Sequence, residues 1–147
     1  GEGEGRAGDF LSAFAPRAPW TRFCLPIGVL LRDVCLNVDT REGASKFVVY
    51  GRGIILVHIV GIVVAIRHYP ERSKVLVEDA TGQIECAVTS PCSLSLGSLV
   101  TIQGKLYQGI DSVMRIHANA YRIETDPNIE AHHYLKSIRM IEKLQET

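Results

Sequence analysis

Residues 53–123 carry the hydrophobic pattern of a β protein. The segment GIILVHIVGIVVAIR, residues 53–67, is nearly continuous in Ile and Val, as in a strand buried on both sides for much of its length. Gly61 lies within this run, and a glycine there lets a strand coil sharply, as a small barrel requires. Shorter strands are predicted over 74–79 and 83–88, because the Ala-Thr-Gly between them is typical of a tight hairpin.

Two further strands are predicted from strict alternation of apolar and polar residues. In the first, Val100, Ile102, Gly104 and Leu106 share one face, and Thr101, Gln103, Lys105 and Tyr107 share the other. In the second, Met114, Ile116, Ala118 and Ala120 share one face, and Arg115, His117, Asn119 and Tyr121 share the other. We expect the apolar sets to face the core and the polar sets to face solvent or a ligand.

A helix is predicted after these strands. Asp126 is a favoured N-cap residue, Pro127 suits the first helical position, and apolar residues follow at helical spacing. Five strands followed by a helix favour an all-β fold with a C-terminal α-helix, in which the strands form a five-stranded Greek-key barrel of the OB (oligonucleotide/oligosaccharide-binding) type. Spacing alone leaves an SH3-like barrel or a small sandwich as alternatives.

The domain organisation follows from the same pattern. We expect a flexible N-terminal tail and packing arm over 1–24, an OB domain over 25–125, and a C-terminal helix over 126–147 that caps the barrel and docks a partner. Residues 27–38 are apolar and fit either a strand or a short helical turn.

Composition excludes several classes of function. The 16 Lys and Arg balance the 16 Asp and Glu, so a nucleic-acid-binding role needs basic residues gathered locally or shared with a partner. The four scattered cysteines predict buried thiols in a reducing compartment, and the neighbouring His132 and His133 diverge by about 100° on a helix, which disfavours a metal site. The sequence has no catalytic motif, so we expect neither an enzyme nor a cofactor.

An ordered set of motifs resembles a known family. The segment VLVEDATGQIEC (75–86) resembles the V-D-D-x-T-G-x-I-x-C core of the Stn subunits of the CST telomere-capping complex, which are similar to the middle subunit of replication protein A. VGIVVAIR (60–67), LGSLVTIQG (96–104), and IHANAY (116–121) followed by Asp-Pro-Asn are similar to other motifs of that family. The chain departs from it in a short loop after the third strand and in Ala87, where several relatives carry tryptophan.

The resemblance implies a nuclear protein at chromosome telomeres that binds single-stranded telomeric DNA through its OB fold. It implies as partners a small Ten-type OB subunit and a large Ctc-type scaffold, and extends the expected contacts to DNA polymerase alpha-primase and telomerase components. The alternatives are an architectural OB adaptor without direct DNA binding, and a replication protein A middle subunit.

An OB barrel binds single strands across its second and third strands, between the first-second and fourth-fifth loops. Basic and aromatic residues gather at these places, as needed to neutralise phosphates and stack on bases. The predicted nucleic-acid-binding residues are Arg67, His68, Tyr69, Arg72, Lys74, Lys105, Tyr107, Arg115 and His117. The alternative is that the charges are solvated, Tyr107 caps the barrel and His117 is a structural strand residue. Glu71, Glu78 and Glu85 lie nearby and predict weak affinity.

The apolar stripe of the helix has two interpretations. It either closes the end of the barrel or docks a second OB protein, and the second is favoured because the stripe continues to the end of the helix. The predicted partner-binding residues are Tyr134, Leu135, Ile138, Ile141 and Leu144.

Overall fold

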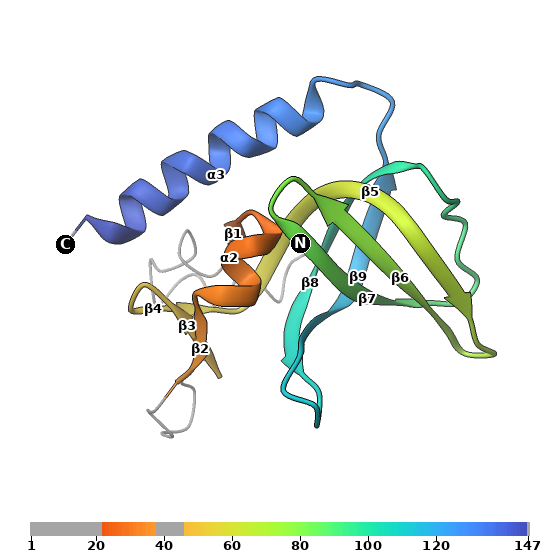
Figure 1. The fold of residues 1–147 in the computed structure, drawn as a ribbon, viewed down its shortest axis with the longest axis horizontal. Coiled ribbons are helices and arrows are strands. Elements are labelled where there is room, and N and C mark those ends of the chain that lie inside the picture. Colours follow the sequence, from red (N-terminus) through yellow and green to blue (C-terminus); the bar gives the residue numbers. More distant parts are fainter. Residues whose placement is uncertain (1–21, 38–45, 147) are drawn as a thin grey trace, which may run out of the picture.

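The computed structural model describes residues 22–37 and 46–146, which form a closed barrel with a C-terminal helix (Figure 1). The predicted fold class is confirmed. The main sheet has the order β1-β5-β6-β7-β9-β8 and closes through pairing of β5 with β8. Its strands are β1 (Arg22–Cys24), β5 (Leu56–His68), β6 (Arg72–Asp79), β7 (Gly82–Thr89), β8 (Leu99–Gln108) and β9 (Met114–Ile123).

The long strand β5 closes the barrel because it pairs with two neighbours. Its first half pairs with β8, from Leu56↔Lys105 to Ile62↔Leu99, and its second half pairs with β6. Gly61 lies at the changeover, where a Cβ atom would approach the Glu78 carbonyl oxygen to 2.5 Å. Only glycine therefore permits this approach of the two backbones, in agreement with the role predicted for Gly61.

Strands β7 and β9 are parallel neighbours although β8 lies between them in the sequence. They pair at Cys86↔Ile116 and Ala87↔His117, which brings the third and fifth strands of the barrel side by side. The inward side chains of all five barrel strands fill the core; the largest fully buried ones include Ile59, Ile84, Ile102 and Ile116.

The N-terminal part adds structure that the hydrophobic pattern did not predict. The segment that fitted either a strand or a helical turn contains both, α2 (Ile27–Arg32) and β2 (Val34–Leu36). Strand β2 belongs to a small three-stranded sheet with β3 (Phe47–Val49) and β4 (Arg52–Ile54). The predicted strand over 53–67 is therefore two strands, divided at Ile55. Residues 1–21, most of the predicted tail and arm, lie outside the described residues.

Helix α2 is capped by the β6–β7 turn and not by its own sequence. Asp79 Oδ2 accepts a hydrogen bond from the Ile27 amide (2.9 Å), and Thr81 Oγ1 accepts one from the Gly28 amide (2.7 Å). Asp79 Oδ1 also accepts bonds from the amides of Thr81 (2.7 Å) and Gly82 (3.1 Å). The Asp-Ala-Thr-Gly motif thus shapes its own turn and joins the N-terminal helix to the barrel.

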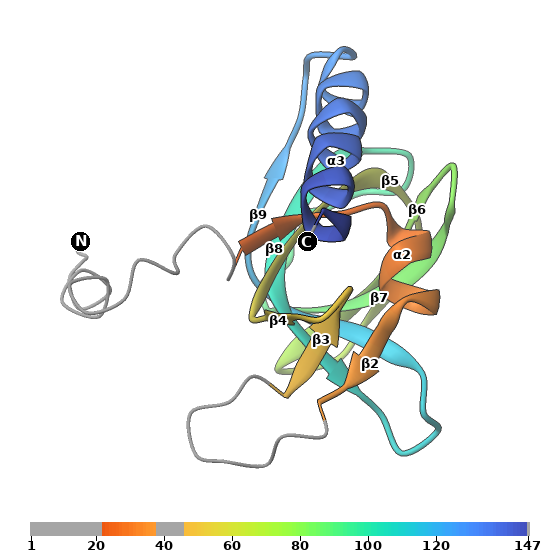
Figure 2. The same ribbon diagram turned by 90° about the vertical axis from the view of Figure 1, so that its left-hand side faces the viewer.

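Helix α3 (Ile129–Gln145) lies against β1 and β5 on the outside of the barrel (Figures 1 and 2). It begins two residues later than predicted: Asp126 is not the N-cap, and its Oδ1 instead accepts a bond from the Asn128 amide (2.9 Å). Its fully buried side chains are Ser137 and Leu144. Neither α2 nor α3 combines the length and hydropathy that a membrane-spanning helix needs.

The cysteines only partly match their predicted burial. Cys86 is buried, Cys24 and Cys92 are half-buried, Cys35 on β2 is exposed, and no disulfide joins any of these four. Burial raises the pKa of the Cys86 thiol well above its usual range, so this side chain packs as a small apolar group. The predicted burial is wrong for Cys35.

Candidate nucleic-acid interface

Four of the predicted site residues lie together on the outer face of β8 and β9. Lys105 pairs with His117 and Tyr107 pairs with Arg115 across these antiparallel strands, so all four side chains point the same way. The Tyr107 and His117 rings are stacked, with centroids 3.8 Å apart and planes 16° from parallel. His117 is exposed, so the stacked pair presents aromatic surface to solvent.

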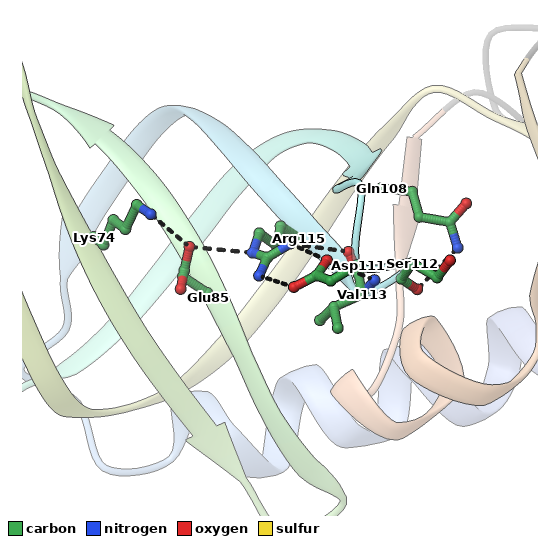
Figure 3. A network of polar contacts seen from close by, with 7 residues as sticks. All are labelled: Lys74, Glu85, Gln108, Asp111, Ser112, Val113 and Arg115. Carbon is green, nitrogen blue, oxygen red and sulfur yellow. Dashed lines mark hydrogen bonds and ion pairs between the residues drawn. The ribbon is translucent and has the colours of Figure 1, made fainter.

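Glu85 on β7 connects this group to β6, as Figure 3 shows. Its Oε2 lies 3.2 Å from Arg115 Nε and 3.9 Å from Lys74 Nζ. The connection depends on the parallel β7–β9 pairing, because Glu85 precedes Cys86, the partner of Ile116. Three strands thus contribute to one row of alternating charge across the outer face of the barrel.

Asp111, in the turn between β8 and β9, holds the other edge of the Arg115 guanidinium (Figure 3). Nη1 and Nη2 donate to its two carboxylate oxygens at 2.9 and 2.8 Å. The hydrogen bonds from Arg115 and from the Val113 amide hold the pKa of Asp111 well below its usual range. The same pairing raises the pKa of Arg115. The carboxylates of Glu85 and Asp111 therefore orient the Arg115 guanidinium and balance its positive charge.

The β5–β6 turn brings further predicted residues to the same face. Arg67 pairs with Lys74 across the two strands, and Lys74 Nζ lies 5.7 Å from the centre of the Tyr69 ring. Arg72 is near enough to Tyr107 for its positive charge to affect the pKa of the Tyr107 hydroxyl. Burial and the charge of Glu85 raise the pKa of the Tyr107 hydroxyl, and the charges of Arg115 and Arg72 oppose that rise.

His68 is the exception among the nine residues. It pairs across the strands with Ser73, which is buried, and its Nδ1 lies 2.8 Å from Ser73 Oγ. Side chains alternate along β6, so Ser73 and His68 point to the side opposite Lys74 and Arg67. Its predicted place beside the other cations is therefore wrong.

The alternation predicted for β9 fails beyond His117. The pairing with β8 shifts between Ala118 and Ala120, which leaves Asn119 as an extra residue in a β-bulge. After the bulge Ala120 is exposed, and Tyr121, predicted to face outward, packs against the core. Its hydroxyl is 3.0 Å from Ser93 Oγ, in the loop after β7.

We call the eight remaining residues, gathered on one side of the barrel, the cationic–aromatic face: Arg67, Tyr69, Arg72, Lys74, Lys105, Tyr107, Arg115 and His117. Sequence reasoning missed Asp111, whose position four residues before Arg115 was a signal for an ion pair. It also missed Ile110 and Val113, two exposed apolar side chains in the same turn.

The predicted partner-binding residues on α3 differ in how exposed their side chains are. Tyr134 and Leu135 are 56% and 54% exposed, and Ile138 and Ile141 are half-buried. Leu144 is 1% exposed and belongs to the core, so its surface is not available to a partner. Beside Tyr134 an apolar cleft of about 310 Å³ opens between α3 and the β6–β7 turn, with Ala131 and Pro26 among its lining residues.

The structure therefore defines the class of protein as an OB-fold barrel with an outer C-terminal helix. Among the described residues, no three His, Cys, Asp or Glu side chains gather in a way that fits a metal ion. No family model and no curated protein matches the sequence.

Several solved structures share this fold. A chain of a replication protein A heterotrimer bound to single-stranded DNA matches with a TM-score of 0.73 and 20% identity, over 86% of this chain and 99% of the other. A chain of the S. pombe Stn1–Ten1 complex gives 0.70 and 20%, over 84% and 93%. Yeast replication protein A bound to single-stranded DNA gives 0.63 and 24%, over 81% and 88%. The resemblance to Stn subunits and replication protein A is thus confirmed at the level of the fold.

Proposed function

We propose that this protein is a single-strand-binding subunit of a complex of OB-fold proteins, acts by binding and not by catalysis, and serves in telomere capping in the nucleus. The observation that carries the proposal is the exposed Tyr107–His117 stack, with Arg115 and Lys105 beside it. Aromatic surface flanked by cations is what a single strand requires of a protein. The structural neighbours from replication protein A, solved with single-stranded DNA, support this assignment.

The stacked pair offers a base a flat surface at a site that cations surround. Stacking one base on an aromatic side chain contributes about 1–3 kcal/mol to binding, independently of base identity. We therefore expect Tyr107 and His117 to supply most of the binding energy at this face, and Lys105, Arg67 and Arg72 to position the phosphates.

The DNA half of the proposal is tested by fluorescence anisotropy with G-rich telomeric single strands, using the chain alone and with its small OB partner. We expect Tyr107→Ala to weaken binding about 5- to 100-fold, which corresponds to the loss of one stacked base. Tyr134→Ala is the matched control in the assay of the chain alone, where no partner contact is involved, because Tyr134 is an exposed tyrosine on α3, away from this face. Equal effects of the two substitutions, or no binding by the unaltered chain in either state, would overturn DNA binding at this face.

The telomeric part is tested separately with the same measurement. A telomere-capping subunit should bind G-rich telomeric strands more tightly than pyrimidine strands of equal length, when its partner is present. Equal affinity for both strands points instead to a general replication protein A-type subunit.

The assembly half rests on the exposed apolar side chains of α3 and the apolar cleft beside them. Tyr134, Leu135 and Ala131 leave apolar surface that association with another subunit would bury. We expect Leu135→Glu to prevent copurification of the OB partner, whereas Lys136→Ala, about 100° around the helix from Leu135, leaves it intact. Deletion of the helix is the weaker test, because it also removes the buried Ser137 and Leu144.

One observation favours an alternative, an architectural adaptor that binds only protein. Arg115 is already paired with Asp111 and Glu85, and Lys74 lies beside Glu85, so these cations are compensated within the chain. If Tyr69→Ala and Tyr107→Ala leave the DNA affinity of the assembled complex unchanged while assembly is intact, the adaptor is the correct function.

A further inference from the structure

A second cationic surface lies under α3, apart from the cationic–aromatic face. A groove of about 560 Å³ separates the first half of α3 from the outer side of β5, β8 and β9. We call it the helix groove. Its basic and imidazole side chains are His58, Arg122, His132, His133 and Lys136.

The charge of the helix groove differs from that of the apolar cleft on the other side of α3. The cleft is lined by two carboxylates, Asp79 and Glu130, whereas none of the described residues that line the helix groove is Asp or Glu. A carboxylate outside the lining, that of Glu124, pairs with one of its cations and accepts a hydrogen bond from Arg122 Nε at 2.8 Å. The groove is thus suited to an anion.

Lys136 and Arg122 are the fixed positive charges of this groove. His133 is not counted with them, because burial lowers its pKa, although its Nε2 donates to the Leu25 carbonyl oxygen at 3.3 Å and this bond opposes the shift. Both cations are accessible: Lys136 is exposed on α3, and the Arg122 side chain is 70% exposed on β9. Arg122 is already paired with Glu124, so Lys136 is the cation that can neutralise about one phosphate here.

Strand β8 connects the helix groove to the cationic–aromatic face. Its outward side chains alternate in the order Thr101, Gln103, Lys105 and Tyr107. Thr101 and Gln103 line the groove, while Lys105 and Tyr107 belong to the cationic–aromatic face. From Thr101 to Tyr107 the strand extends about 20 Å. No Asp or Glu interrupts this row on β8, and Gln103 Nε2 donates to Asn119 Oδ1 beside it (3.1 Å).

We propose that the helix groove is a phosphate-binding extension of the single-strand site. A strand bound at Tyr107 and His117 continues along the outer row of β8, and its backbone enters the groove, where Lys136 neutralises about one further phosphate. This inference rests on the proposed single-strand binding, and it adds a direction for the strand and a longer footprint.

The experiment compares two single strands of the same composition, about 6 and about 12 nucleotides long, in salt titrations of the chain, or of its complex with the OB partner if only that binds. Each phosphate contact contributes about −0.7 to the slope of log K against log salt. We expect the longer strand to give a slope steeper by about 0.7, so that its binding loses about 2.6-fold more between 50 and 200 mM salt.

A substitution locates the additional contact. Lys136→Ala should remove this difference of about 0.7 between the slopes, with the shorter strand unaffected. Arg139→Ala is the matched control, because Arg139 lies on the same helix, is exposed and is not among the residues that line the groove.

Three outcomes would overturn the extension. Equal slopes for both lengths would show that no phosphate beyond the cationic–aromatic face is bound. Equal effects of Lys136→Ala and Arg139→Ala would show that the groove has no particular role, and loss of partner copurification in Lys136→Ala would assign it to a protein. Failure of both strands to bind in either state would instead overturn the proposed function itself.

Discussion

The β6–β7 and β8–β9 turns each contain an aspartate that accepts hydrogen bonds from the turn itself, but the two aspartates have different tasks. Asp79 is half-buried and accepts hydrogen bonds from the amides of Ile27, Thr81 and Gly82, so it joins α2 to the barrel. Asp111 is exposed, and its main partner is the Arg115 side chain on the cationic–aromatic face. The partners of a carboxylate, and not its place in a turn, thus decide whether it supports the fold or adjusts the charge of a surface.

This difference has a physical cause. Backbone amides have no other acceptor once the turn and the helix are formed, so removing Asp79 leaves donors without partners inside the structure. A guanidinium at the surface is solvated in any case, so removing Asp111 returns Arg115 to water or to a ligand. Substitutions at the two turns should therefore affect different measurements.

The largest effect is expected at the β6–β7 turn. Asp79→Asn places an amide group among backbone donors and should lower the free energy of unfolding by about 2–4 kcal/mol, measured by urea denaturation. The DNA affinity of the folded molecules should not change, because Asp79 is absent from the cationic–aromatic face. If the variant is as stable as the parent chain, Asp79 does not hold α2 to the barrel.

A smaller effect, of a different kind, is expected from Glu85→Gln. The substitution removes the carboxylate that lies between Lys74 and Arg115, so Lys74 becomes available to phosphates and Arg115 keeps only Asp111 as its partner. Single-strand affinity at low salt should rise, and the salt slope should steepen by up to about 1.4. Glu78→Gln is the control, because Glu78 lies on β6 and accepts a hydrogen bond from Gln83 instead of pairing with these cations. A fall in affinity would mean that Glu85 is needed to orient Arg115.

The smallest effect is expected from Asp111→Asn, the same substitution as in the first prediction. The urea midpoint should stay that of the parent chain, and the salt slope should steepen by about 0.7 as Arg115 gains one phosphate contact. Because the pKa of Asp111 is lowered, acidification to about pH 5 leaves it ionised and should not reproduce the substitution. A destabilisation as large as that of Asp79→Asn would remove the distinction between the turns.

The sequence predicted most of the barrel because its strands follow a local rule. Strands β6 to β9 begin and end within about two residues of the predicted bounds, since apolar and polar positions alternate along them. The three-residue strands β2 to β4 are too short to show such a period. The start of α2 depends on Asp79 and Thr81, more than 50 residues away, and no local pattern contains that information.

The candidate site was predictable in its residues more than in its electrostatics. Eight of nine residues share one face because register and alternation place them there, and His68 fails because its strand partner is the buried Ser73. The pairing of Arg115 with Glu85 arises from the parallel contact of β7 and β9, which the order of strands in the sequence does not reveal. The bulge at Asn119 likewise reverses the orientation of Tyr121 without any change in residue pattern.

The short strand β1 has a consequence for how this barrel enters a larger assembly. Residues 56–58 of β5 bond to β8 on one side and to β1, in parallel, on the other. With both sides of that stretch occupied by the chain itself, no strand of another protein can pair with β5 there. A neighbouring subunit must therefore recognise this stretch of β5 through side chains, whose identity can evolve one residue at a time, and not through backbone pairing that any extended segment can imitate.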